Sequence, residues 1–229
     1  MSGLRGVLYV AAGAAHLQAA AASARSVRQT NPALGIAVFT DRSCNDDVFD
    51  AVHPVSEPHK RSKVDYLGAA PFDEVLYLDT DTRVYGELGT MFRLLERFDL
   101  AVAQRQRPVV RRKSPKLFAD VPASFPEHNG GVLLYRRSPE MLAFLDAWRT
   151  AYHEAGLTAD QRSFREALWT SSIRFAVLPV RYNTRRFTWL DWMAAGGRMP
   201  DILHVNRFNP AKRGGAVQRA LSRLAGPGL

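Results

Sequence analysis

Residues 74–84 read EVLYLDTDTRV, and this stretch carries the clearest sequence signal of the fold class. The apolar run from Val75 to Leu78 ends at two aspartates one residue apart, Asp79 and Asp81. Because the run is continuous rather than alternating, it predicts a strand that is covered on both faces, as in the centre of a parallel sheet. The two carboxylates would then follow the carboxyl end of that strand, where open α/β sheets bind their ligands.

Strands and helices are expected to alternate on both sides of this segment. The expected strands cover residues 5–11, 35–41, 51–55, 74–79, 99–104, 130–136, 174–180 and 201–205. The expected helices cover residues 14–29, 62–69, 88–97, 139–154 and 159–168, with irregular loops at 105–127 and 184–200. Such alternation is typical of an α/β fold. Its looser form in the second half favours a mixed, mainly parallel central sheet flanked by helices.

The composition is that of an ordinary globular protein. The 229 residues are 46% hydrophobic and 23% charged, so we expect one domain over residues 1–211 and a basic helix or tail over 212–229. The single cysteine, Cys44, excludes an internal disulfide and fits a reducing compartment, which predicts a cytoplasmic protein. No stretch approaches the roughly 20 apolar residues of a membrane-spanning helix.

Basic residues outnumber acidic ones by 31 to 22, which gives a formal charge of +9. This excess suits polyanionic partners such as phosphorylated substrates, an acidic membrane surface or nucleic acid. Much of the charge lies in residues 105–116 and 212–223. In the second segment Val217, Leu221 and Leu224 would form the apolar face of an interfacial helix, so peripheral membrane contact is one hypothesis and a solvated basic face the other. Nucleic-acid binding has little support, because both segments are poor in aromatic residues.

The spacing of Asp79 and Asp81 indicates a cation site. In an extended chain residues i and i+2 face the same side, so both carboxylates would converge while Thr80 points away. Mg²⁺ or Mn²⁺ held by a few carboxylate oxygens keeps positions for substrate phosphates. The alternative is that the pair ends the strand in a solvated loop.

From this pair outward, the sequence resembles the GT-A nucleotide-sugar glycosyltransferases, in particular glycosyltransferase family 8, which includes glycogenin and bacterial lipopolysaccharide glycosyltransferases. Six short matches occur in the family's order and span nearly the whole chain. They are RSKVDYL with Lys63, VLYLDTDTRV, HNGGVLLYRR with Asn129, Gly130 and Gly131, ADQRSF with Asp160 and Gln161, LPVRYNTR with Tyr182 and Asn183, and ILHVNRF with His204. The resemblance implies the GT-A fold and an NDP-sugar donor.

The resemblance also implies how the donor is bound. His204 would join Asp79 and Asp81 as a ligand of Mn²⁺ or Mg²⁺, and Lys63 would lie near the donor diphosphate. The other residues expected to contact the donor are Asn129, Gly130, Gly131, Asp160 and Gln161 beside the sugar, Tyr9, Val10, Ala11, Thr40 and Asp41 beside the base, and Thr80 between the carboxylates. Each also has a structural alternative, such as a hydrogen-bonded histidine at a strand end or a lysine on a solvated helix face.

The chain departs from the family at two places. Several members carry an acidic or amide residue after the first strand, where this chain has Ala11, Ala12 and Gly13, which weakens the expectation of a uracil base. The family's lysine after the late histidine is also missing, and Arg207 or Lys212 would replace it.

These inferences predict a metal-dependent transferase that moves a sugar from a nucleoside diphosphate sugar, expected to be a UDP-sugar, to a hydroxyl of a glycan, lipid or protein. The resemblance implies retention at the anomeric carbon, with Lys63, Asp160 and Gln161 as catalytic candidates. One alternative is a basic module that binds nucleic acid or membrane without catalysis. Another is an aspartyl-nucleophile phosphatase, which Arg83 disfavours because those enzymes carry Thr or Val at that position.

Overall fold

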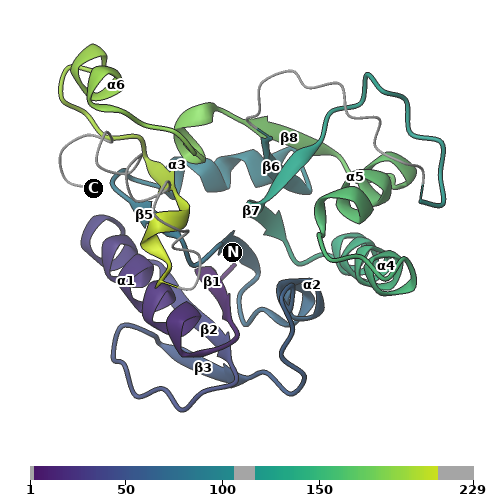
Figure 1. The fold of residues 1–229 in the computed structure, drawn as a ribbon, viewed down its shortest axis with the longest axis horizontal. Coiled ribbons are helices and arrows are strands. Elements are labelled where there is room, and N and C mark those ends of the chain that lie inside the picture. Colours follow the sequence, from purple (N-terminus) through teal and green to yellow (C-terminus); the bar gives the residue numbers. More distant parts are fainter. Residues whose placement is uncertain (1–2, 106–116, 211–229) are drawn as a thin grey trace.

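The computed structural model describes residues 3–105 and 117–210, and it contains a seven-stranded sheet in the order β3-β2-β1-β4-β7-β6-β8 (Figure 1). The strands are β1 (Arg5–Ala11), β2 (Gly35–Thr40), β3 (Ala51–Pro54), β4 (Glu74–Leu78), β6 (Leu100–Gln104), β7 (His128–Arg136) and β8 (Phe175–Leu178). All neighbouring pairs are parallel except those of β7, which runs antiparallel to β4 and to β6. The expected mixed, mainly parallel sheet is therefore confirmed.

Helices cover both faces of the sheet. They are α1 (Ala14–Thr30), α2 (Lys63–Tyr66), α3 (Gly89–Phe92), α4 (Pro139–Glu154), α5 (Gln161–Thr170) and α6 (Trp189–Ala194). One hydrophobic cluster lies between the sheet and α1 and α3, and a second lies between the sheet and α2, α4 and α5. Every residue of β4 is buried, as its continuous apolar run predicts, because each face of this central strand meets one of the two clusters.

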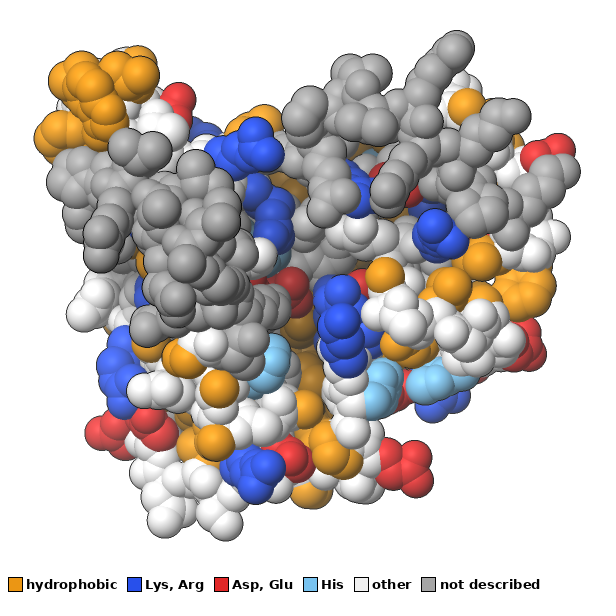
Figure 2. Space-filling model, in the orientation of Figure 1, with side chains coloured by type: hydrophobic (Ala, Val, Ile, Leu, Met, Phe, Trp, Pro, Cys, Tyr) orange, Lys and Arg blue, Asp and Glu red, His pale blue; other side chains and the backbone are white. Residues whose placement is uncertain are grey.

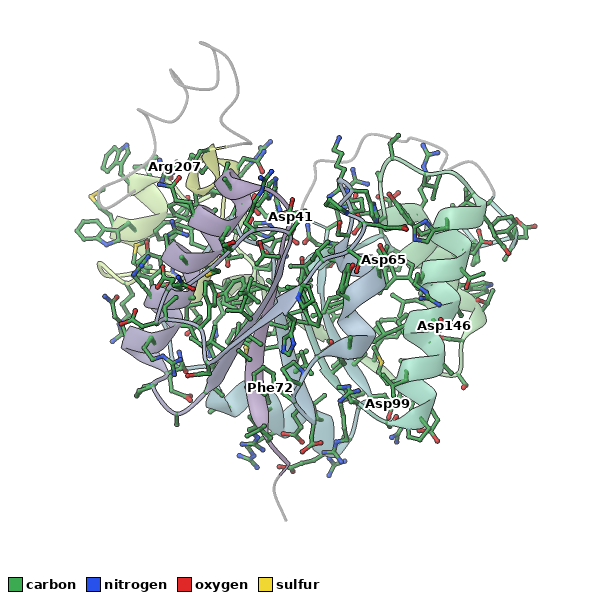
Figure 3. All side chains as sticks on the ribbon, turned by 90° about the horizontal axis from the view of Figure 1, so that it is seen from below. Asp41, Asp65, Phe72, Asp99, Asp146 and Arg207 are labelled. Carbon is green, nitrogen blue, oxygen red and sulfur yellow. The ribbon has the colours of Figure 1, made fainter. Side chains whose placement is uncertain are left out.

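The direction of β7 brings distant motifs to one edge of the sheet. Because β7 opposes β4, the amino end of β7 lies beside the carboxyl end of β4, and Leu78 pairs with Val132. Figure 3 places Asp41, which follows β2, near this edge, whereas Phe72 and Asp99, which precede β4 and β6, lie at the opposite edge. The segments that follow β1, β2 and β4 and the start of β7 therefore meet in one place.

Four expected elements differ from the structure. The chain after Asp81 forms strand β5 (Thr82–Val84), which pairs antiparallel with β9 (Ile202–His204) in a separate small sheet, so the predicted strand at 201–205 does not join the main one. The predicted helices at 62–69 and 88–97 continue after α2 and α3 as 3₁₀ turns, Leu67–Ala69 and Arg93–Glu96. The expected loop at 184–200 contains α6, whose start is fixed by a capping box between Thr188 and Asp191.

Among the described residues, no helix is long and apolar enough to cross a membrane. Of the basic segment 105–116, only Arg105 lies among the described residues. The expected tail helix at 212–229 lies outside them.

Candidate functional site

A cleft of about 910 Å³ opens at the edge where the carboxyl ends of β1, β2 and β4 meet the amino end of β7. Eleven of the predicted residues line it: Val10, Asp41, Lys63, Asp79, Thr80, Asn129, Gly130, Gly131, Asp160, Gln161 and His204. Basic, acidic and histidine side chains gather around the central hollow of the face in Figure 2. The structure thus brings together residues that are distant in the sequence.

The two aspartates lie in the turn between β4 and β5. The expected reason for their convergence, a spacing of two residues in an extended strand, was wrong. The Asp79 amide donates to the Gly131 carbonyl at 2.8 Å, and the Thr82 hydroxyl donates to the Asp79 carbonyl at 2.8 Å. Pairing of β5 with β9 then carries His204 to the same turn. Nε2 of His204 lies 3.6 Å from Asp79 Oδ2 and 3.2 Å from Asp81 Oδ1. The carboxylates therefore converge because of this turn.

The partners of His204 decide where its ring proton lies. Nδ1 is 2.8 Å from Oδ1 of Asn183, so the neutral ring donates from Nδ1 and keeps a lone pair on Nε2. That lone pair faces Asp79 and Asp81, whose side chain is fully buried. The three ligand atoms lie within 4.8 Å of one another. We call Asp79, Asp81 and His204 the buried triad after its two buried members, since Asp79 is partly exposed. Its donor set of two carboxylates and one imidazole suits a divalent ion such as Mn²⁺.

The absence of a side chain at Gly131 leaves room for the buried triad. A Cβ atom there would lie 2.4 Å from Cε1 of His204 and 2.8 Å from Oδ2 of Asp79. No other residue type fits without displacing these ligands. The residues present therefore fit a bound cation both in chemistry and in space.

Thr80 points away from the carboxylates, as expected. Its hydroxyl accepts a hydrogen bond from Nδ2 of Asn209 at 2.9 Å and lies 3.4 Å from Nδ1 of His16. These contacts tie the turn to α1 and to the segment after β9.

Lys63 sits in a buried ion pair next to the buried triad. Its Nζ lies 2.9 Å from Asp160 Oδ2 and 3.5 Å from Asp79 Oδ1, and donates to the Gly130 carbonyl at 2.7 Å. Burial opposes the charge of Lys63, but Asp160 and Asp79 outweigh it, so the pKa of Lys63 is raised. Burial likewise opposes the charge of Asp160, and Lys63 and Arg61 outweigh it, so the pKa of Asp160 is lowered. Both residues are therefore held charged.

Two further predicted residues are positioned beside this ion pair. Oδ1 of Asn129 accepts the Gly131 amide at 2.8 Å, which fixes its side chain at the start of β7. Gln161 begins α5 and is partly exposed in the cleft. A Cβ at Gly130 would lie 3.2 Å from Nζ of Lys63, so glycine here relieves the crowding around the buried lysine.

Three residues expected beside the base do not line the cleft. Tyr9 and Ala11 are fully buried and Thr40 nearly so. Tyr9 and Ala11 belong to the cluster beneath α1, and the Tyr9 hydroxyl lies 3.0 Å from the hydroxyl of Ser23. Because strand residues alternate between faces, only Val10 of this strand reaches the cleft. Asp41 lines the cleft as well, and its Oδ1 accepts the amide of Gly13 at 2.7 Å.

Of the two cations expected after the late histidine, only Arg207 lies among the described residues, and it does not line the cleft. Arg207 packs against the ring of Phe208, 5.8 Å from its centroid, and is not a lining residue, while Lys212 lies outside the described residues. The cleft instead contains Arg185, whose Nη1 lies 2.9 Å from Nε2 of His204 and whose Nη2 donates to Asn206 at 3.3 Å. The sequence held a signal for Arg185, because this residue stands two positions after Asn183 in LPVRYNTR, one of the segments that resemble the family.

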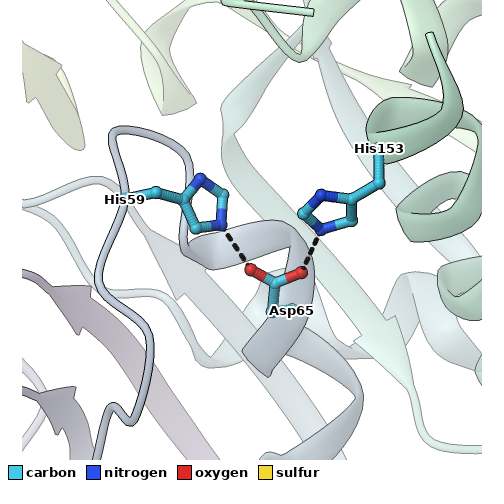
Figure 4. Close-up of side chains that lie close together, drawn as sticks. All are labelled: His59, Asp65 and His153. Atoms are coloured by element: carbon cyan, nitrogen blue, oxygen red, sulfur yellow. Dashed lines mark hydrogen bonds and ion pairs between the residues drawn. The ribbon is translucent and has the colours of Figure 1, made fainter. Parts of the chain in front are cut away.

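A second group of histidine and carboxylate consists of His59, which lines the cleft, and of Asp65 and His153 next to it (Figure 4). Asp65 of α2 binds Nε2 of His59 through Oδ2 at 2.5 Å and Nε2 of His153 of α4 through Oδ1 at 2.7 Å. The Arg61 amide donates to Nδ1 of His59 at 3.3 Å, which puts the proton of the neutral ring on Nε2. We call His59, Asp65 and His153 the histidine clamp. It ties the cleft wall at residues 58–62 to two helices, and sequence reasoning missed it.

No protein-family model and no curated protein matches the chain. Solved structures do. The chain is similar to the glycosyltransferase GlyE of Streptococcus pneumoniae TIGR4, with 20% identity, a TM-score of 0.59 and coverage of 96% of this chain and 60% of that one. It is also similar to mouse xyloside xylosyltransferase 1 (16% identity, TM-score 0.56, 90% of this chain and 99% of that one).

A third similar structure is the galactosyltransferase LgtC in complex with donor and acceptor sugar analogues, with 14% identity, a TM-score of 0.58 and coverage of 96% of this chain and 94% of that one. These likenesses confirm that the chain has the GT-A fold of glycosyltransferases. The chain spans about 60% of the length of GlyE. Membership of family 8 stays a prediction.

Proposed function

We propose that this protein is a metal-dependent glycosyltransferase that moves a sugar from a UDP-sugar to an acceptor hydroxyl. The observation that carries the proposal is the buried triad beside a cleft of about 910 Å³, at the sheet edge where α/β folds bind ligands; Asp79 and His204 line the cleft, and Asp81 is fully buried next to them. The likeness to solved glycosyltransferases supports the same activity.

Asp79, Asp81 and His204 would hold Mn²⁺ or Mg²⁺. When bound, the ion supplies positive charge to the diphosphate of the donor and to its departure. Asn183 contributes by fixing the tautomer of His204, since its Oδ1 accepts a hydrogen bond from Nδ1–H, which leaves the Nε2 lone pair for the ion. Gly131 contributes by leaving that space open.

Arg185 is our proposed replacement for the missing lysine of the family. Its guanidinium lines the cleft and contacts His204 and Asn206. Two planar N–H groups suit the bidentate binding of a phosphate. Because Arg185 now donates to the lone pair of His204 that the ion would use, we propose that it turns to the diphosphate when ion and donor bind.

Lys63, Asp160 and Gln161 would position the sugar rather than attack it. Asp160 is 3% exposed and paired with Lys63 at 2.9 Å and Arg61 at 3.4 Å, which keeps it anionic beside the donor. An anion here stabilises positive charge that develops on the sugar ring. Val10 and Asp41 would border the base. Retention at the anomeric carbon rests on the family resemblance, and we assign no nucleophile.

The geometry favours this proposal over both alternatives. The phosphatase hypothesis needs a nucleophilic aspartate, whereas Asp79 accepts the hydroxyl of Tyr77 at 2.8 Å and points with Asp81 at His204. The nucleic-acid hypothesis needs stacking aromatic side chains in a basic groove. The cleft offers only Tyr77 among Phe, Tyr and Trp in the described part of the chain.

The direct test is a thermal-shift screen of UDP- and GDP-sugars with and without Mn²⁺. A ligand that binds only the folded state raises the melting temperature, so we expect UDP-sugars to stabilise the protein when Mn²⁺ is present. Substitution of both Asp79 and Asp81 by Asn should abolish that shift. A metal-independent shift, or one for GDP-sugars alone, would contradict the assigned donor and ion.

A further inference from the structure

Residues 186–200 form a projection that we call the apolar finger. It leaves the cleft after Arg185, runs through α6 and returns to β9. Figure 1 shows α6 at the periphery of the molecule, away from the central sheet. The finger therefore starts next to Arg185 in the proposed active site and returns to the strand that carries His204, while its helix lies on the outside.

The helix of the finger presents large apolar side chains to solvent. Trp189, Leu190 and Met193 are 48%, 57% and 52% exposed, and α6 contains no buried residue. In Figure 2 hydrophobic side chains gather at the corner of the molecule where Figure 1 draws α6. Isolated exposed apolar residues are ordinary, but three of them on one short helix form a patch that calls for a partner.

The finger is built to hold this patch outward. The capping box between Thr188 and Asp191 fixes the first turn of α6. Gly196 and Gly197 adopt φ values of 62° and 77°, which reverse the chain after the helix. The ring of Trp192 packs within 3.5 Å of the position of a Cβ at Gly197. The exposure of the apolar patch thus results from the defined local structure of the finger.

The charges around the patch identify the partner. Arg186 precedes α6 and Arg198 follows it, and both are exposed. Neither makes an ion pair with another described residue. The one acid of the finger, Asp191, has its carboxylate engaged by Thr188. Tryptophan prefers the boundary between hydrocarbon and water, and arginine beside it binds lipid phosphates.

We propose that the apolar finger inserts Trp189, Leu190 and Met193 into the interfacial layer of an anionic lipid bilayer, with Arg186 and Arg198 on the headgroups. Insertion would place the mouth of the cleft beside the membrane, because Arg185 at the foot of the finger lines the cleft. This site differs from the basic tail at 212–229, and its test does not depend on sugar transfer.

The test is flotation of the full chain with vesicles of phosphatidylcholine, with and without phosphatidylglycerol. We expect binding to the anionic vesicles, and quenching of tryptophan fluorescence by brominated acyl chains. The triple variant Trp189→Ser, Leu190→Ser, Met193→Ser should reduce partitioning at least roughly tenfold, since each side chain loses its apolar contact. Trp169→Ser, at an exposed site on α5 outside the finger, should not change it.

Arg186→Glu with Arg198→Glu should also weaken binding to anionic vesicles and lower its salt dependence. Unchanged melting temperatures would exclude unfolding as the cause. Full binding by the triple variant would overturn the proposal. The proposal would also fall if light scattering shows a dimer that the triple substitution converts to a monomer. It would fall likewise if acrylamide quenches the finger's tryptophans only after Leu190 and Met193 are replaced. In both cases a protein segment would cover the patch.

Discussion

The buried triad and the histidine clamp contain the same kinds of side chain but use opposite hydrogen-bond polarity. In the triad, His204 donates from Nδ1 to Asn183 and turns an Nε2 lone pair toward two carboxylates. In the clamp, His59 accepts at Nδ1 from a backbone amide and gives its Nε2 proton to Asp65. Lone pairs that face one another favour a positive group between them, and Arg185 Nη1 lies 2.9 Å from the Nε2 lone pair of His204, whereas a proton already lies between the groups of the clamp.

Burial separates the two clusters as well. Asp81 and His204 have side chains that are 0% and 1% exposed, and Asp79 is 18% exposed, so the repulsion between the two carboxylates is poorly screened. The clamp residues His59 and Asp65 have side chains that are 31% and 23% exposed, and water can solvate them. Both clusters keep their ligand atoms within 4.8 Å of one another. Proximity of ligand types is therefore common to both clusters, and the direction of their protons and lone pairs is what favours the triad as the proposed cation site.

The largest effect should come from removing the carboxylates of the triad. With Asp79→Asn and Asp81→Asn together, we expect Mn²⁺ binding to fall more than roughly 100-fold, because even the loss of groups that only orient ligands costs 10- to 100-fold. Titration followed by electron paramagnetic resonance of free Mn²⁺ would measure it. A saturable site that remained in this variant and vanished on Asp65→Asn would show that the clamp binds the ion and would break the comparison.

The next effect should come from filling the space in the triad. Gly131→Ala places a methyl group against His204 and Asp79, so we expect a roughly 10- to 100-fold loss of Mn²⁺ affinity and about 1–3 kcal/mol less stability. Gly68→Ala is the matched control, because its added Cβ meets only Leu142 at 3.8 Å. Wild-type affinity in Gly131→Ala would mean that the triad rearranges freely.

A smaller effect should come from the tautomer of His204. Asn183→Ala removes the acceptor of the Nδ1 proton, and we expect Mn²⁺ affinity to fall roughly tenfold. Asn183→Asp keeps an acceptor at this place and should preserve binding. Equal losses in both variants would show that Asn183 acts through packing and not through the proton on His204.

Much of this arrangement could be predicted from the sequence because its signals are local. The carboxylates, Asn129 and Gly131 stand directly at strand ends, and the topology of a mixed sheet brings those ends together. The prediction for Tyr9 and Ala11 did not hold, because it ignored that successive residues of a strand face opposite sides.

Other features depend on contacts that the sequence does not encode locally. Arg185 and not Arg207 lines the cleft, and it contacts His204 of β9, whose partner β5 is a strand of only three residues directly after the aspartate turn. The clamp joins His153 to Asp65 across 88 positions, and no local pattern marks such a pair. The helix in the finger lacks the length that periodicity needs, and its caps are its only sequence signal.

The smallest effect on the ion should come from the clamp itself. The Asp65 carboxylate accepts hydrogen bonds from the N–H groups of two imidazole rings. In Asp65→Asn the amide oxygen can accept only one of them, and the amide N–H groups face the other ring. We expect about 1–2 kcal/mol less stability in urea unfolding, from two partly exposed hydrogen bonds, and Mn²⁺ affinity within twofold of wild type. Apparent donor affinity should fall only if the wall at residues 58–62 moves, because Lys60 and Arg61 line the cleft there. If Asp65→Asn lowered the Mn²⁺ affinity as far as Asn183→Ala does, the two clusters would be coupled. The contrast between a cation site in the triad and a proton site in the clamp would then no longer hold.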